Sequence, residues 1–183
     1  MIRSLIALLV ASLAACTLPQ SDSRSTPQAL PDANAFPPVA QLLDVRCGSL
    51  DCHGTVARNL RLYGSAGLRW SASDRPLSPT CDRKAEVDQD YESIVGLEPE
   101  VMGQVVASGG TNPDALTMVR KARGTESHKG GKIWSEGDDS DTCLVSWLSG
   151  KADAGACAKG LVDVIPGGSS NPLAACATLP PVP

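Results

Sequence analysis

The sequence predicts a small all-α domain built from short helices and long loops. Apolar residues recur at intervals of three and four in several short stretches, whereas the alternating pattern of strands is rare. The chain also holds 17 glycines and 14 prolines, which favour irregular connections. We expect the domain to occupy residues 39–150.

Two segments precede the predicted domain. Residues 1–15 place Arg3 before the apolar run Leu5–Leu13, which is too short to span a bilayer and is typical of a secretory signal. The run ends in "LAAC", which resembles the lipobox of bacterial lipoproteins and implies that Cys16 is acylated and becomes the first mature residue. The alternative is ordinary signal cleavage, with Cys16 incidental. Residues 16–38 are rich in Pro, Ser and Ala, and we expect a disordered tether.

Five helices are expected in the domain, each with apolar residues at helical spacing. In chain order their apolar residues and end signals are Val39, Leu42 and Leu43 leading into Cys47; Val87, Tyr91 and Ile94 followed by Gly96; Met102, Val105 and Val106 after Glu98-Pro99-Glu100; Leu116, Val119 and Ala122 between a cap at Asn112-Pro113-Asp114 and Gly124; and Cys143, Leu144 and Trp147 between Asp139 and Gly150. The acids of "EGDDSD", 136–141, lack the alternating register of a calcium loop, so they are interpreted as the cap of the last helix.

Large side chains are scarce in this chain. It contains 1 Phe, 2 Tyr and 3 Trp, and Phe36 falls in the predicted tether. A core this thin usually needs disulfides or a bound cofactor. Residues 151–183 form a Gly-, Pro- and Ala-rich extension with Cys157 and Cys176. A disulfide between these two cysteines, or from one of them to the core, would hold the extension.

The charge and the compartment narrow the chemistry. The formal net charge is -4, and cleavage before Cys16 removes Arg3 and no acid, which takes the charge from -4 to about -5. An acidic chain without a Lys/Arg cluster is not expected to bind nucleic acid. Export places the other six cysteines in an oxidising compartment. Six cysteines suit three disulfides, or two disulfides plus two thioether bonds.

The motif "CGSLDCH" holds Cys47, Cys52 and His53. A histidine directly after the second of two cysteines is typical of haem c attachment, although the usual loop between the cysteines has two residues rather than four. Zinc bound by Cys47, Cys52, His53 and a fourth ligand is a second interpretation, but adjacent ligands fit a tetrahedral site poorly. A Cys47–Cys52 disulfide beside an exposed His53 is the third.

The second histidine favours haem. His128 follows the predicted fourth helix and precedes the closing helix, and this placement resembles that of the distal iron ligand in small class I cytochromes c. Met102 and Met118 are the other distal candidates, but both are expected to fill the core. Rim groups for the haem propionates are expected shortly after the motif, with a solvated surface role as the alternative for each arginine: Arg58, Arg61, Tyr63, Arg69 and Trp70.

Three stretches carry a family resemblance over about residues 40–150. They are "CGSLDCHG", "LTMVRKARGTESHKGGKIW" and "LVSWLSG". Together they resemble the cytochrome c domains of certain bacterial surface and lipoprotein cytochromes. The resemblance implies a cytochrome c-like fold with one haem c attached at Cys47 and Cys52, and with His53 proximal and His128 distal to the iron.

These observations predict a lipid-anchored monohaem c-type cytochrome that transfers electrons at the cell envelope. Two axial nitrogen ligands leave no open position for substrate, so we do not expect an enzyme. The expected partners are the membrane, through lipid at Cys16, and redox proteins. Thr17 favours the outer membrane, facing the periplasm or the surface, by analogy with other lipoproteins. The alternative is a cofactor-free, disulfide-stapled envelope lipoprotein that serves as an interaction or structural module.

Overall fold

The structure, a computed structural model, describes residues 28–71 and 84–162. Within these ranges the fold is all-α, as the sequence predicts, and Tyr63 and Leu68 form an isolated bridge. The α-helices are α2 (Pro37–Cys47), α3 (Lys84–Val95), α4 (Pro99–Ala107), α5 (Thr117–Arg123), α6 (Asp139–Leu148) and α7 (Ala154–Val162), with two 3-10 turns, η2 (Ala33–Ala35) and η3 (Pro113–Ala115). The predicted signal segment, Cys16, Cys81 and Cys176 lie outside the described residues.

The helix ends follow the predicted signals with one exception. Gly124 ends α5 with φ 73°, and the Asp138 side chain caps α6 by accepting from the backbone N–H of Asp141 at 2.9 Å. The predicted cap at Asn112 is wrong: the chain forms η3, extends at Leu116, and only then begins α5. The N-terminus of α5 is instead capped by the carboxylate of Glu98, which accepts from the Thr117 N–H at 2.8 Å.

The domain begins earlier than predicted, because Phe36 belongs to its core rather than to a tether. Phe36 is fully buried, with its ring centroid 4.8 Å from that of Trp147. The indole N–H of Trp147 donates to the carbonyl of Asp32 at 2.9 Å, and the Tyr91 hydroxyl donates to the carbonyl of Pro31 at 2.8 Å. In a chain with one phenylalanine, this ring supplies volume that the core otherwise lacks, so the predicted tether 16–38 extends too far.

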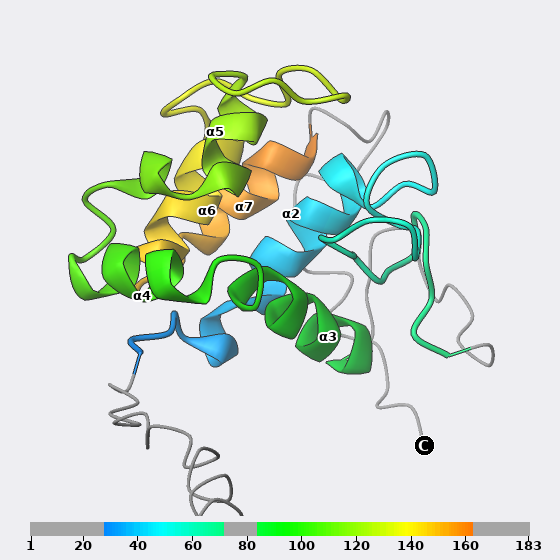
Figure 1. The fold of residues 1–183 in the computed structure, drawn as a ribbon, viewed down its shortest axis with the longest axis horizontal. Coiled ribbons are helices and arrows are strands. Elements are labelled where there is room, and N and C mark those ends of the chain that lie inside the picture. The colour runs from blue at the N-terminus through cyan, green and yellow to red at the C-terminus, as the bar shows by residue number, and fades with distance from the viewer. Residues whose placement is uncertain (1–27, 72–83, 163–183) are drawn as a thin grey trace, which may run out of the picture.

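The domain also ends later than predicted, because α7 packs beside α6 and α2 (Figure 1). A disulfide joins Cys143 on α6 to Cys157 on α7. This is the pairing to the core that the sequence left open, and it excludes a Cys157–Cys176 bond. Gly160 lies against Ser140, where an added Cβ would stand 2.8 Å from the hydroxyl oxygen. The glycine that suggested a weak extension thus lets two helices approach closely.

Two long loops meet on one side of the helices (Figure 1). The first, 48–71, leaves the end of α2, and the second, 124–138, connects α5 to α6. The second loop is closed at its base by a buried ion pair in which Arg123 donates to both carboxylate oxygens of Asp141 at 2.8 Å. Among the described helices, none has the length and apolar character needed to cross a membrane.

Candidate functional site

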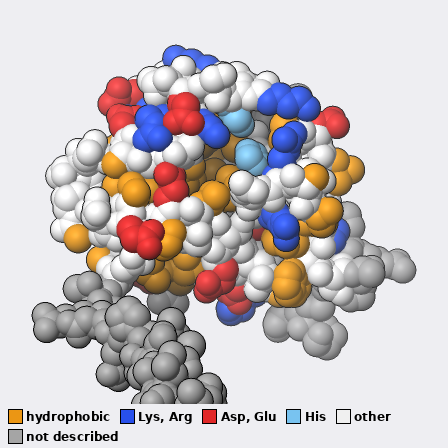
Figure 2. All heavy atoms as spheres, viewed as in Figure 1, with side chains coloured by type: hydrophobic (Ala, Val, Ile, Leu, Met, Phe, Trp, Pro, Cys, Tyr) orange, Lys and Arg blue, Asp and Glu red, His pale blue; other side chains and the backbone are white. Residues whose placement is uncertain are grey.

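A cavity of about 730 Å³ lies between the two loops and brings together all four residues that the sequence singled out, Cys47, Cys52, His53 and His128. Its volume falls within the range of sites for small molecules and cofactors, roughly 300–1,000 Å³. Figure 2 shows the two histidine side chains side by side in this hollow. The apolar part of its wall consists of Leu43, Ala57, Leu60, Leu97, Met118, Ala122, Ile133, Trp134 and Leu144.

The cysteine motif folds back on the end of α2. The backbone N–H of His53 donates to the carbonyl of Cys47 at 2.9 Å, and that of Cys52 donates to Ser49 at 2.9 Å. Gly54 then packs against the backbone of Gly48 and the Cα of Gly67, where any side chain would clash. The four-residue loop is therefore a compact turn that holds the second cysteine and the histidine at the cavity.

His53 is held with one nitrogen available. Its Nδ1 lies 3.1 Å from the carbonyl oxygen of Leu60, and since a carbonyl only accepts, Nδ1 carries the proton and Nε2 keeps its lone pair. Burial lowers the pKa of His53, and the positive charges of Arg58 and Lys121 act in the same direction, while the bond to Leu60 opposes them. The neutral ring with a free Nε2 is the form that binds a metal.

His128 is oriented in the same way by its own turn. Its Nδ1 lies 3.3 Å from the carbonyl oxygen of Gly131, and the Gly131 N–H donates back to the carbonyl of His128 at 2.9 Å. Gly131 has φ 69°, which favours glycine. The N–H groups of Ile133 and Trp134 both donate to the carbonyl of Ala122, which holds the loop to α5. The "HKGG" sequence thus forms a turn that leaves Nε2 of His128 available.

The two imidazole rings lie nearly parallel to each other in the cavity. Their ring centroids are 5.9 Å apart and their planes are inclined by 18°. A metal ion bonded to one nitrogen of each ring would separate the centroids by about 6 Å, from two bonds of about 2 Å and the half-widths of the rings. The separation of the centroids therefore matches the distance that one metal ion between two imidazoles requires.

Comparisons with protein-family models, curated protein sequences and solved structures find no match for this chain.

Cys47 and Cys52 are free thiols, in contrast to the bonded Cys143 and Cys157. Burial raises the pKa of Cys47 to about 12, with smaller contributions from Cys52 and Asp44 that outweigh the opposing charge of Arg46. A neutral thiol is a poor metal ligand. The described residues contain no group of three or more His, Cys, Asp or Glu side chains that could hold a metal ion, so the zinc interpretation gains no support.

Only one of the predicted rim groups lines the cavity. Arg58 does so, and its Nε donates to the carbonyl of Cys52 at 3.2 Å. Arg69 instead binds the buried carboxylate of Glu86 at 2.7 and 2.9 Å, Arg61 bonds the carbonyl of Arg58, and Tyr63 and Trp70 pack edge to face with centroids 5.4 Å apart. Sequence reasoning missed Lys121 and Lys129, which also line the cavity. Their nearness to His128 in the sequence was the available signal.

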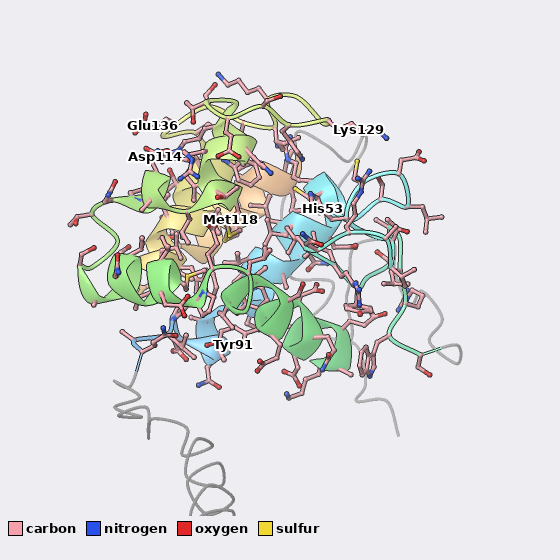
Figure 3. The ribbon with its side chains drawn as sticks, in the orientation of Figure 1. His53, Tyr91, Asp114, Met118, Lys129 and Glu136 are labelled. Carbon is pink, nitrogen blue, oxygen red and sulfur yellow. A yellow bond between two sulfur atoms is a disulfide. The ribbon has the colours of Figure 1, made fainter. Side chains whose placement is uncertain are left out.

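The two methionines considered as distal ligands occupy different positions. Met102, on α4, is 1% exposed and belongs to the hydrophobic core. It is not among the residues that line the cavity, as expected for a residue that fills the core. Met118 packs against the core but also lines the cavity from α5 (Figure 3). Trp134 forms another part of the wall, and its indole N–H has no acceptor among the described residues.

Proposed function

We propose that this chain is a lipid-anchored monohaem c-type cytochrome that passes single electrons between partners at the cell envelope. The observation that carries the proposal is the pair of imidazoles, His53 and His128, 5.9 Å apart in a cavity that also holds two free thiols. Each Nδ1 faces a backbone carbonyl, so each Nε2 is available to a metal. The two histidines come from loops far apart in the sequence.

The residues present fit a haem. Cys47 and Cys52 would hold it through thioether bonds, His53 and His128 would bind its iron, and Leu43, Ile133 and Leu144 would pack against its apolar faces. When bound, a haem supplies an iron that changes its charge by one electron. With both histidines bound to its iron, the haem would have no position left for a substrate, which favours electron transfer over catalysis.

The cavity residues would also set the properties of the site. The Leu60 carbonyl fixes the tautomer of His53 and would make its Nε2 a more basic ligand. Two imidazole ligands would give the iron a lower reduction potential than one imidazole and the thioether of Met118. Lys121 also lines the cavity and would place positive charge beside the carboxylate groups of a bound haem. Acylation at Cys16 would keep this site at a membrane, with the outer membrane the favoured location.

The test is expression of the full chain together with haem c maturation machinery, followed by a pyridine haemochrome spectrum. We expect covalent haem at one per chain, lost in Cys47→Ala/Cys52→Ala. Peptide mapping should find haem on both cysteines. A colourless product with a Cys47–Cys52 disulfide would refute the proposal and support the cofactor-free lipoprotein. Mass spectrometry of the mature N-terminus, with Cys16→Ala as control, tests acylation separately.

A further inference from the structure

The two most exposed large apolar side chains of the described residues directly precede Asp51 and Ala57, which line the cavity. Leu50 is 67% exposed and Val56 is 65% exposed, and both belong to the loop that carries Cys52 and His53. Leu97, also exposed, lines the cavity itself. Single exposed apolar residues are ordinary, but three that line one cavity or directly precede residues lining it are typical of an interaction site.

Arg58 and Lys129 line the same cavity, together with the acids Asp51 and Glu98, of which Glu98 is bonded to Thr117. Arg58 donates to backbone carbonyls, and Lys129 projects outward from the tip of the loop above His53 (Figure 3). Among the described residues neither has a carboxylate partner. Figure 2 shows basic side chains next to the two histidines.

Several basic residues in other parts of the domain pair with carboxylates instead. Examples are Arg69–Glu86, Lys84–Asp88, Arg120–Glu126, Arg123–Asp141 and Lys159–Asp139. Arg58 and Lys129 have no such pair within the described residues, so their charges are available to something outside the chain.

We infer that the mouth patch, formed by Leu50, Val56, Leu97, Arg58 and Lys129, docks an acidic redox protein. This inference rests on the proposed function, because an electron must enter or leave near the cavity. The chain as a whole is acidic, with a formal net charge of -4. An acidic partner is repelled by most of this surface and attracted at the mouth patch, which orients the encounter. An apolar centre with a charged rim matches the small interfaces of transient redox complexes.

The test uses an acidic plant-type ferredoxin as the probe and the haem-loaded full chain as the acceptor. Electron transfer from reduced ferredoxin should slow as salt rises, although both proteins are acidic overall. Arg58→Gln/Lys129→Gln should slow the transfer about tenfold at low salt, because two attractive charges are lost. Leu50→Ser/Val56→Ser should slow it several-fold. Lys151→Gln, which removes an exposed positive charge away from the cavity, should leave the rate unchanged.

Carbodiimide cross-linking gives a readout that needs no haem. Ferredoxin carboxylates should couple to Lys129 several-fold more than to Lys151. Haem-loaded protein that couples equally at both lysines would overturn the docking inference alone, as would a Lys151→Gln variant slowed as much as the double variant. Phosphatidylglycerol micelles that shield the mouth patch from chemical labelling more than ferredoxin does would overturn the docking inference in favour of a membrane surface. If the chain expressed with haem c maturation machinery carries no haem but still couples at Lys129, the result would refute the proposed function and leave the docking inference standing.

Discussion

The imidazole rings of His53 and His128 lie nearly parallel with their centroids 5.9 Å apart, but the two residues are held by different numbers of hydrogen bonds. His53 uses its N–H to bond Cys47, its carbonyl to bond Leu62 and its ring to bond Leu60. His128 lies in a loop of mostly exposed residues, and its ring bond to Gly131 is longer, at 3.3 Å. His53 is thus the fixed member of the pair, and His128 is the replaceable one.

If the chain is the cytochrome proposed above, replacement of His128 by alanine should leave the haem attached and remove one of the two ligands of its iron. We expect the absorption spectrum to change from low spin to high spin, and added imidazole to restore it, whereas His53→Ala should greatly reduce haem incorporation. Met102→Leu is the control, because Met102 is buried away from the cavity. A His128→Ala protein with an unchanged spectrum would identify another distal ligand, with Met118 as the first candidate.

Gly130 provides a gentler test of the same ligand. A Cβ at this position would lie 3.1 Å from Cε1 of His128 and 3.4 Å from Nδ1, so Gly130→Ala should push the ring from its position. We expect a mixture of high-spin and low-spin haem, with cofactor content unchanged. Gly155→Ala in α7 is the matched control and should keep the native spectrum. Identical spectra for both variants would show that His128 does not bind the iron.

Much of the site could be predicted from the sequence because its signals are local. The adjacency of Cys52 and His53 and the turn residues after His128 each belong to one short stretch, and all four predicted residues line the same cavity. The rim could not be predicted in this way. Arg69 is bound by Glu86, and Lys121 enters the cavity from a helix whose orientation depends on tertiary packing.

The limits of the domain were hidden for a different reason. Phe36 lies in a Pro- and Ala-rich stretch and Gly160 in a Gly- and Ala-rich one, so composition suggested disorder at both ends. Burial of Phe36 against Trp147 and close approach of Gly160 to Ser140 are long-range contacts. Short sequence patterns do not predict such contacts. For the same reason the sequence did not determine which cysteine bonds to Cys143.

The disulfide between Cys143 and Cys157 should contribute measurably to stability. The two cysteines are 14 positions apart. Closure of a loop of that size restricts the unfolded chain by about 3 kcal/mol. We expect Cys143→Ala/Cys157→Ala to lower the free energy of unfolding in urea by about that amount. Reducing agent should destabilise the native protein more than this variant, and equal effects on the two would contradict the assignment.

Asp90 should make stability fall as the pH rises. Burial raises the pKa of Asp90 from 3.8 to about 8, and Asp44 and Glu86 raise it further, while the N–H of Tyr63, 2.7 Å from Oδ1, lowers it. Because the folded pKa lies above the unfolded one, the contribution of Asp90 to stability is complete below the unfolded pKa and is lost as the pH rises through about 8.

Asp90→Asn keeps the acceptor for Tyr63 and cannot ionise, so its urea midpoint should decline less than that of the native protein between about pH 4 and 8. Above about pH 8 the variant should be the more stable of the two. Asp88→Asn is the control, because Asp88 is exposed on the same helix and pairs with Lys84. Parallel pH profiles for the native protein and Asp90→Asn would show that Asp90 is already ionised in the folded state.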